Sequence, residues 1–374
     1  MKTLFLIFHG FQEHNGISKK IRFQIDALRQ CGVETDLCYM DVDNVGHRKR
    51  MINNEVYEDY GSGIIGKIRK RIKYSGLIKY IITNKIDLVY IRHDHNSSPF
   101  LIRFFKKLRK CGIIIFLEIP TYPYEHEFVG WQMKRDLFVE KFFRKSLMKQ
   151  IHRIVTFSNQ DTIFGVPAIK ISNGIDFEKI KMKEHVGNIS GQINLIGVAE
   201  IHFWHGFDRL IKGLIQYYQN TQSVKVIFHI VGAGDTAPLK QLVQENHLER
   251  YVIFHGTQFG DNLDNLFEQA DMGVASLARH RSNITYIKTL KNREYAARGI
   301  PFIYSEIDED FENMPYVMKV PADETPIPIN DIIRFRISKH FDPKEIRDSI
   351  YDLSWKSQMQ KVIDNFTNSF EKRN

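Results

Sequence analysis

Short runs of apolar residues alternate with amphipathic segments along nearly the whole chain. The first run, residues 4–8, leads to an amphipathic segment at about 18–30, which Ser18 can cap and in which Ile21, Ile25 and Leu28 share one face. Similar runs lie at 33–40, 86–91, 113–118, 153–157 and 168–172, with further amphipathic segments at 99–110 and 134–149. Strands that are apolar throughout are typical of parallel sheets covered by helices on both faces. The pattern predicts an α/β domain, with the polar residues 42–62 as a loop.

The alternation restarts after a polar interruption. The turn residues SNGID (172–176) and the polar segment 181–192 precede a second series of apolar runs, at 193–199, 224–231, 251–254, 272–276 and 301–305. A chain of 374 residues also exceeds what one ordinary core supports. We predict two Rossmann-like domains, residues 1–172 and 173–352, with a cleft between them, and an amphipathic helix within the C-terminal segment 353–374.

Positive charge is concentrated in the first half of the chain. The net charge is +9, and residues 1–172 carry 29 Lys and Arg against 17 Asp and Glu, so the remainder is slightly acidic. The excess gathers in 67–73, 103–110 and 134–149, where apolar residues are interleaved. Two interpretations stay open, solvated helix faces or a basic amphipathic surface that rests on anionic lipid. Nucleic acid is not favoured, because the chain shows no zinc spacing and no DNA- or RNA-binding signature.

Simple features exclude other classes of protein. No apolar run approaches the roughly 18–20 residues of a membrane span, and the run at residues 4–8 is expected to be a strand rather than part of a signal peptide. Cys31, Cys38 and Cys111 form no CxxC pair, which indicates a reducing cytoplasm and no metal site. We expect a cytoplasmic protein that needs no metal and no other cofactor.

Two loops of the second half have the composition of phosphate-binding sites. In IVGAGD, Gly232 and Gly234 follow an apolar run, where glycine lets backbone N–H groups approach a phosphate; a plain tight turn is the alternative. The segment LARHRSNITYIK (277–288) follows another strand and carries Arg279, His280, Arg281 and Lys288. Because ligands bind at the carboxyl ends of parallel strands, this loop predicts a diphosphate site, with an exposed basic loop as the alternative.

The stretch LKNREYAARGIPFIY (290–304) places one carboxylate among cations. Gly299 ends the expected helix in a left-handed cap, and Pro301 begins the next strand. Glu294 lies about one turn into the helix, where it can reach vicinal hydroxyls, and Lys288 and Lys291 lie upstream of it. This arrangement is expected of a ligand-binding helix rather than of a salt-bridged surface.

The order of these pieces resembles glycosyltransferase family 4, retaining sugar-nucleotide enzymes of GT-B architecture. The resemblance is carried by SNGID, GVAEIHFWHGFDRLIKGL, IVGAGD, VIFHG, LFEQADMGVASL and, above all, LKNREYAARGIPFIY. It covers about residues 172–310, and the first half is similar mainly in topology. The WHGFDRLI and LKNREYAARGIPF pieces look like a subgroup associated with bacterial surface-polysaccharide synthesis. The resemblance implies two Rossmann-like domains facing across a cleft, with the C-terminal helix packing back on the first.

The resemblance also implies roles for residues of the second half. Glu294 falls on the family's second signature glutamate, which contacts the donor's ribose hydroxyls. At the position of the family's earlier signature glutamate, this chain has Tyr286. The family also has an Arg and a Lys that neutralise the leaving diphosphate, and this chain has Glu200 and His205 at those positions. We hypothesise that the N-terminus of the following helix shares this neutralisation with His205, Lys288 or Lys291, and Arg281. The remaining expected donor-binding residues are Gly16, Gly232, Gly234 and His255.

Loops of the first half are candidates for the acceptor side. Gly16 lies in the loop where the family's glycine contacts donor phosphate and acceptor. His93 follows the run 86–91 and is the candidate for contact with the transferred sugar, with an ordinary surface histidine as the alternative. The loop EIPTYPYEHE (118–127) offers Glu118, Tyr122 and His126 to an acceptor.

These features together predict a retaining glycosyltransferase. It would move a hexose from a nucleoside-diphosphate sugar to a lipid-linked or polysaccharide acceptor, in the cytoplasm or on the inner face of the plasma membrane. His93 and Glu294 are the candidate catalytic residues. Two alternatives keep the fold. One is a sugar-nucleotide epimerase. The other is a non-catalytic binding protein, which is suggested by the altered signature positions Tyr286, Glu200 and His205.

Overall fold

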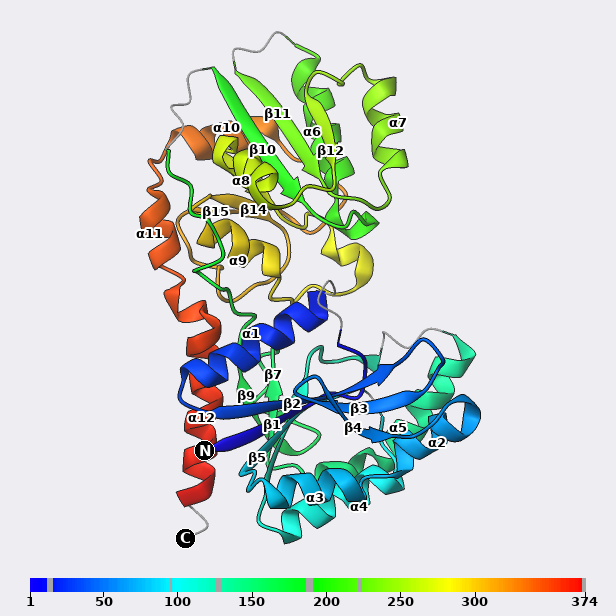
Figure 1. Cartoon of the computed structure of the whole chain (residues 1–374). Helices are drawn as coiled ribbons and strands as arrows, with labels where there is room; N and C mark the ends of the chain where they lie inside the picture. The colour runs from blue at the N-terminus through cyan, green and yellow to red at the C-terminus, as the bar shows by residue number, and fades with distance from the viewer. Residues whose placement is uncertain (12–15, 95, 126–129, 186–190, 221–223, 372–374) are drawn as a thin grey trace. The chain divides into compact units, whose positions relative to one another are not determined.

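The chain divides into two compact units (Figure 1). Residues 1–172 and 355–374 form the first, called domain 1 below, and residues 173–354 form the second, domain 2. The computed structural model describes residues 1–11, 16–94, 96–125, 130–185, 191–220 and 224–371.

Domain 1 is built on a mainly parallel sheet. Among the described residues it has nine strands in the order β4-β3-β2-β1-β5-β6-β7-β9-β8. Its parallel part consists of β1 (Lys2–Leu6), β2 (Glu34–Val42), β5 (Leu88–Arg92), β6 (Ile114–Ile119), β7 (Arg153–Thr156) and β9 (Val166–Lys170), and β8 (Thr162–Ile163) adds an antiparallel edge. Each parallel strand overlaps a predicted apolar run, so the predicted α/β class is confirmed.

Residues 42–62 differ from the prediction of a loop. They contain a hairpin in which β3 (Arg48–Ile52) pairs antiparallel with both β2 and β4 (Glu55–Asp59). Asn53 and Asn54 make its turn with φ of 49° and 71°. Asparagine adopts such angles more readily than most residues. The Asn-Asn pair at the turn is therefore the sequence signal of this hairpin.

Helices cover both faces of the sheet of domain 1 (Figure 1). α1 (Gly16–Gln30) and α12 (Trp355–Glu371) share one apolar cluster, and α3 (Ser75–Thr83), α4 (Pro99–Lys110) and α5 (Trp131–Met148) share the other. α2 (Gly63–Ile72) packs against α4 and β3. Among the helices in the described ranges, none has both the length and the apolar content of a membrane span.

The C-terminal helix α12 packs on α1 of domain 1. Its Trp355, Met359, Val362 and Phe366 recur at helical spacing and are buried in the cluster that also holds Ile21. The backbone N–H of Ser172 donates to Oε1 of Gln358 at 2.7 Å, which fixes the start of the helix. The predicted packing of the C-terminal helix on the first domain is therefore confirmed.

Domain 2 has a parallel sheet in the order β12-β11-β10-β13-β14-β15. Its strands are β10 (Gln192–Val198), β11 (Lys225–Val231), β12 (Val252–Gly256), β13 (Met272–Val274), β14 (Phe302–Tyr304) and β15 (Val317–Lys319). Its helices are α6 (Phe207–Tyr218), α7 (Ala237–Glu245), α8 (Gly260–Gln269), α9 (Leu290–Ala297), α10 (Ile329–Ile337) and α11 (Pro343–Asp348), with short 3-10 helices η2 (Phe203–His205), η3 (Arg279–Ser282) and η4 (Tyr351–Leu353). The short strand β15 is the one that the apolar runs did not predict.

We expect Met359→Ala to weaken the attachment of α12. The side chain is fully buried in the cluster shared with α1, so its truncation should lower the free energy of unfolding of domain 1 by about 2–5 kcal/mol. Lys361→Ala, on the exposed side of the same helix, is the control and should change it by less than about 0.5 kcal/mol. Urea unfolding followed by circular dichroism measures both. Equal effects of the two substitutions would contradict the packing of α12 on domain 1.

Candidate functional site

The candidate site lies at the carboxyl ends of β10, β13 and β14 in domain 2. These strands are neighbours, and the strand order reverses between β10 and β13. Loops at such a switch point diverge and leave room for a ligand. The loop after β10 holds η2, and the loop after β13 holds η3; the backbone N–H of Leu277 joins them by donating to the carbonyl of His205 at 2.9 Å.

Lys291, in the first turn of α9, is half-buried as a residue but places a buried ammonium in this site. Its Nζ meets no hydrogen-bond acceptor among the described residues, and neither does Nε of Arg279. Burial and the positive charge of Arg279 lower the pKa of Lys291 to about 7, against the opposing effect of Glu306. A buried charge without a partner is costly unless a ligand supplies one. The Lys291 ammonium therefore points to an anionic ligand.

Glu306 is the carboxyl group of the same cluster. It is buried and lies two residues beyond the end of β14. Burial raises the pKa of Glu306 to about 7, and Asp308 adds to the shift, whereas Arg279 and Lys291 oppose it. Asn292 Nδ2 donates to Oε1 at 3.5 Å, and Oε2 meets no donor in the described part of the chain. At neutral pH the cluster thus carries more positive than negative charge.

His205 is neutral, which corrects the cationic role expected for it. Burial lowers the pKa of His205 to about 2, and the charges of Lys291, Arg279 and His202 add to the effect. The backbone N–H of His202 donates to Nδ1 of His205 at 3.0 Å, so the ring proton is on Nε2. His205 can donate a hydrogen bond to a ligand, but it adds no counter-charge.

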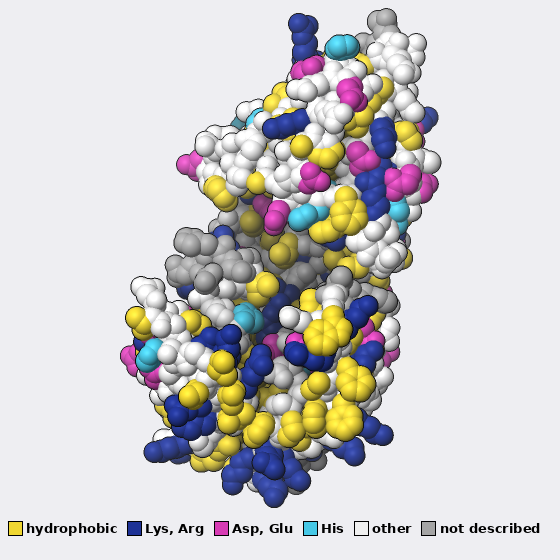
Figure 2. All heavy atoms as spheres, turned by 90° about the vertical axis from the view of Figure 1, so that its right-hand side faces the viewer, with side chains coloured by type: hydrophobic (Ala, Val, Ile, Leu, Met, Phe, Trp, Pro, Cys, Tyr) yellow, Lys and Arg dark blue, Asp and Glu magenta, His cyan; other side chains and the backbone are white. Residues whose placement is uncertain are grey.

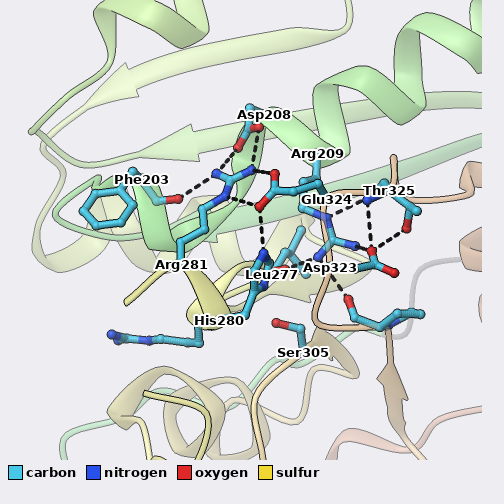
Figure 3. Close-up of polar contacts among 12 residues, drawn as sticks. Phe203, Asp208, Arg209, Leu277, His280, Arg281, Ser305, Asp323, Glu324 and Thr325 are labelled. Atoms are coloured by element: carbon cyan, nitrogen blue, oxygen red, sulfur yellow. Dashed lines mark hydrogen bonds and ion pairs between the residues drawn. The ribbon is translucent and has the colours of Figure 1, made fainter. Parts of the chain in front are cut away.

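Arg281 is engaged in a network within domain 2, as Figure 3 shows. Its Nη atoms donate to the two carboxylate oxygens of Asp208 at 2.8 and 2.9 Å, and one of them also donates to the carbonyl of Phe203 at 2.8 Å. Glu324 accepts from Nε at 2.9 Å and from Nη2 at 2.5 Å. All five N–H donors of the guanidinium are therefore used. Arg281 joins η3 to α6 and to the loop after β15, and its expected role in diphosphate neutralisation is corrected to a structural one.

The structure separates the two lysines that were alternatives for one cationic role. Nζ of Lys288 lies 3.8 Å from Asp310 and 4.0 Å from Glu309, so carboxylates already surround it. Lys291 has no such ion pair among the described residues. The geometry favours Lys291 as the cation that meets a ligand.

Glu294 stays accessible on the same helix. Arg298, one turn later, donates from Nε to its Oε1 at 3.1 Å, while 29% of the Glu294 side chain remains exposed. Arg298 is itself held by Asp264 at 2.7 Å. The carboxylate is thus oriented from one side and open to a ligand on another.

Gly232 and Gly234 are explained by the packing of two loops. Their φ values are 132° and 117°, and a Cβ would lie 1.7 Å from the carbonyl oxygen of Ala199 at Gly232 and 2.4 Å from that of Ile201 at Gly234. The N–H of Gly232 donates to the carbonyl of Gly256 at 2.7 Å and is not available to a phosphate. The tight-turn alternative therefore accounts for the glycine at position 232.

His255, also expected at the donor site, is the second-last residue of β12 and faces another histidine. Its Nε2 lies 2.9 Å from Nδ1 of His229, and the two rings are stacked. Burial lowers the pKa of His255, and burial together with His255 lowers that of His229 to about 4. The pair is therefore neutral at pH 7 and offers no charge to a phosphate.

Glu118 is a buried structural carboxylate of domain 1. Oε2 accepts from Gln24 Nε2 and from the Tyr90 hydroxyl, each at 2.6 Å, and Oε1 accepts from Arg92. Burial acts to raise the pKa of Glu118, but Arg92, Lys20 and these hydrogen bonds hold it below the usual value. The side chain is fully buried. Its expected contact with an acceptor is therefore corrected, because both oxygens serve the domain's own fold.

The other residues expected on the acceptor side remain predictions. His93 directly follows β5, is buried, and packs its ring 6.0 Å from that of Tyr124. Tyr122 is half-buried and packs edge-on against Phe164. Gly16 begins α1. His126 lies outside the described residues.

The sequence patterns did not select Glu306 as a site residue, and they indicated Arg279 only as one of several basic residues in its loop. Glu306 follows a predicted strand at its carboxyl end, so the rule that selected the loop 277–288 could also have selected it. Nothing local in the sequence distinguishes Arg279 from Arg281, since their partners lie far away along the chain.

Arg281→Gln should lower the stability of domain 2 and leave its affinity for pyrophosphate largely unchanged. The substitution removes the hydrogen bonds from Arg281 and leaves Asp208 with Lys212 and Glu324 with His280, which should cost about 1–3 kcal/mol in thermal unfolding. Adding Asp208→Asn should restore part of the loss, because it removes a carboxylate that has lost two of its hydrogen bonds. Unchanged stability with lost pyrophosphate binding in calorimetry would instead return Arg281 to the ligand site.

Comparison with known proteins gives a family match in domain 2 and similar folds for the whole chain. Residues 192–320 match the family model described as "Glycosyl transferases group 1". The search among curated proteins gave no match. Among solved structures the chain is similar to sucrose-phosphate synthase from Thermosynechococcus elongatus, with 13% identity, a TM-score of 0.61 and 99% of each chain covered. It is also similar to the lipopolysaccharide outer core galactosyltransferase WaaB in its apo form, with 14% identity, a TM-score of 0.62 and 99% of each chain covered.

A third similar structure is a Listeria monocytogenes protein assigned as a UDP-N-acetylglucosamine 2-epimerase, with 11% identity and a TM-score of 0.54 over 99% of this chain and 97% of that one. At such identities these likenesses show the fold, which is GT-B as predicted. The family match lies in the domain that holds the cationic cluster. The protein is therefore a glycosyltransferase with the GT-B fold.

Proposed function

We propose that the protein is a retaining hexosyltransferase that uses a nucleoside-diphosphate sugar as donor. Its acceptor would be a lipid-linked or polysaccharide glycan in bacterial surface-glycan synthesis, at the inner face of the plasma membrane. The observation that carries the donor assignment is the buried, unpaired ammonium of Lys291 at the switch point of domain 2. Its position is where a donor's diphosphate is expected in a domain of this family.

The cluster suits the charge that develops as the donor bond breaks. In the transfer, the bond from the anomeric carbon to the diphosphate oxygen breaks, and a bond from the acceptor oxygen to that carbon forms. The acceptor's hydroxyl proton passes to the departing diphosphate on the same face of the sugar. The Lys291 ammonium and the Arg279 guanidinium would stabilise the added negative charge, and His205 would donate from Nε2. Preorganised groups of this kind need little rearrangement during the reaction.

This arrangement would compensate for the unusual loop after β10. Glu200 and the neutral His205 leave that loop without the cations expected from the resemblance. Lys291 and Arg279 come from other segments but act electrostatically on the same His205. We infer that in this chain the neutralising charge has moved from the loop after β10 to η3 and α9. Since side-chain cations meet the diphosphate, we expect no metal requirement, and addition of EDTA should leave the transfer rate unchanged.

Glu294 is proposed to hold the donor's ribose. Its carboxylate is partly exposed and is oriented by Arg298 one turn away. A carboxylate accepts hydrogen bonds from two vicinal hydroxyls without any change of its own charge. His93 and Tyr122 of domain 1 are proposed to contact the transferred sugar and the acceptor.

Epimerisation is the competing reaction for the same fold. It would need two catalytic carboxylates, but Asp308, next to Glu306, already accepts from Arg293 at 2.7 and 3.2 Å. Glu306 is then the available buried carboxyl group of the cluster in the described residues. Transfer is therefore favoured. Product analysis separates the two, because an epimerase converts the nucleotide sugar without any acceptor.

Lys291→Met should weaken donor binding about 10- to 100-fold, as expected for a lost hydrogen bond to a charged group. The matched control is Lys288→Met, which should change the affinity less than about 3-fold, because Lys288 already faces carboxylates. A panel of UDP-, GDP- and ADP-sugars in calorimetry identifies the donor and measures both variants. The melting temperature of the Lys291→Met protein should not fall, since an unpaired buried amine is removed. If no nucleotide sugar binds, the proposed function fails.

Donor binding should become tighter as the pH falls from about 8 to about 6. With its pKa lowered to about 7, the Lys291 amine is largely neutral at the upper limit and charged at the lower one. Glu306, with its pKa raised to about 7, loses negative charge over the same range and acts in the same direction. Calorimetry at several pH values measures this, and the dependence should be smaller in Lys291→Met. An affinity independent of pH would contradict the assignment of the cluster.

A further inference from the structure

Two helices of domain 1 expose large apolar side chains to solvent. On α2, the residues Ile64, Ile65, Ile68 and Ile72 recur at helical spacing and are all exposed, Ile64 to 75%. On α5, the exposed residues are Trp131, Met133, Phe138, Val139 and Phe142; Trp131 is 77% exposed, and Phe138 and Phe142 are each 71% exposed. Isolated exposed apolar residues are common on proteins, but contiguous rows of them mark a binding surface.

The inner face of α5 makes this exposure more informative. Glu140 on that face is buried and accepts from Arg144 at 2.9 and 3.0 Å and from the Tyr124 hydroxyl at 3.2 Å. Arg144 also lies 4.2 Å from the ring centre of Phe164. Ion-paired groups thus anchor α5 to its domain, while aromatic rings face outward. Leu147 and Met148 bury the last turn of α5 in the apolar cluster, so the outward aromatic rings are additional to the apolar face that the fold requires.

Basic side chains surround the apolar rows. On and directly after α2, the exposed cations are Lys67, Arg69, Arg71 and Lys73; on α5 they are Lys134, Arg135, Lys141 and Lys145. Both helices pack against α4, whose exposed cations are Arg103, Lys106, Lys107, Arg109 and Lys110. Figure 2 looks onto domain 1 from this side and shows hydrophobic side chains interspersed with Lys and Arg.

We infer that the exposed faces of α2 and α5 form a docking surface for an anionic lipid bilayer. The apolar side chains would enter the interface between headgroups and acyl chains, and the cations would contact anionic headgroups. This inference deepens the proposed function and rests on it for its biological setting. It names the surface that would bring the enzyme to a lipid-linked acceptor.

The same surface lies next to the loops proposed for the acceptor. His93 begins the loop that leads into α4, and Tyr122 lies in the loop that leads into α5. Trp131 is the first residue of α5, at the end of that helix nearest the second loop. An acceptor whose lipid lies in the bilayer would therefore present its glycan close to His93 and Tyr122.

Other occupants fit the surface less well. A second copy of the chain would place two sets of cations against each other, which opposes association at this face. A nucleic acid would match the cations, but its phosphates would leave the isoleucine row of α2 exposed to water. An anionic bilayer matches both the apolar rows and the charge.

Vesicle flotation of the full chain tests the inference. With vesicles of phosphatidylcholine containing about one-third phosphatidylglycerol, the protein should bind and Trp131 fluorescence should shift to the blue; vesicles of phosphatidylcholine alone should bind it far less. The double variant Phe138→Gln/Phe142→Gln should bind about 10-fold or more weakly. Lys67→Gln/Arg71→Gln should also weaken binding about 10-fold and reduce its sensitivity to salt.

Matched controls use exposed residues away from this surface. Phe259→Gln, at 75% exposure in domain 2, and Lys361→Gln on α12 should bind vesicles as the unmodified protein does. Trp131→Phe should keep binding but lose the blue shift. Absence of binding to anionic vesicles, or equal binding by all variants, would overturn the inference. So would a dimer in solution that Phe138→Gln/Phe142→Gln dissociates, because a second copy would then occupy the surface.

Nucleotide-sugar binding, measured without vesicles, keeps this test separate from that of the proposed function. The surface variants should bind the donor with unchanged affinity. If the donor binds but vesicles do not, the docking surface alone is wrong; if vesicles bind but no donor does, the proposed function is wrong.

Discussion

The buried pair of Arg293 and Asp308 holds the two chain segments that define the cationic site. Arg293 lies on α9 between Lys291 and Glu294, and Asp308 lies two residues beyond Glu306. The guanidinium donates to both carboxylate oxygens at 2.7 and 3.2 Å and to the carbonyl of Thr289 at 2.8 Å, and both partners are fully buried. Breaking such a pair leaves an uncompensated charge and typically costs about 3–5 kcal/mol. The positions of Lys291, Glu294 and Glu306 all depend on this contact. The Arg293 side chain is fully buried, and its Nε meets no acceptor among the described residues.

Within this frame, the domain keeps some charges paired and leaves others unpaired. Arg281 and the Nη atoms of Arg293 are paired with carboxylates, and they fix η3 and α9. Lys291 and the Nε of Arg279 lack acceptors among the described residues, so the fold bears a cost that a bound anion would relieve. Unpaired buried cations are expected at positions where the residue type serves ligand binding rather than the stability of the fold. The contrast between paired and unpaired cations therefore locates the site more sharply than the number of cations does.

Local patterns were enough to predict most of the fold. Apolar runs located the parallel strands, and helical spacing in 355–366 located α12, because strands and helices follow from periodicity. The hairpin of β3 and β4 was missed because its strands carry Arg48, Lys49 and Glu58 and lack an apolar run. The roles of single charged residues were harder to predict. Arg281 finds Asp208 and Glu324, 73 and 43 residues away, and Glu118 finds Gln24, 94 residues away. Such pairings come from the tertiary fold, so the sequence could not show which cation stays free.

In the functions that we propose, the charge of the chain serves two different tasks. Domain 1 carries the basic excess on exposed helices, in which cations lie beside apolar residues such as Ile64 and Phe138. In water the interactions of such exposed cations with single charges are weak because salt screens them. Their summed attraction becomes substantial when they face an extended anionic surface. Domain 2 is slightly acidic in sum, yet it buries the cation Lys291, which acts at short range in a poorly screened environment. The bilayer proposal therefore rests on charge spread over exposed helices, whereas the proposal of a small-anion site rests on burial and missing hydrogen-bond partners.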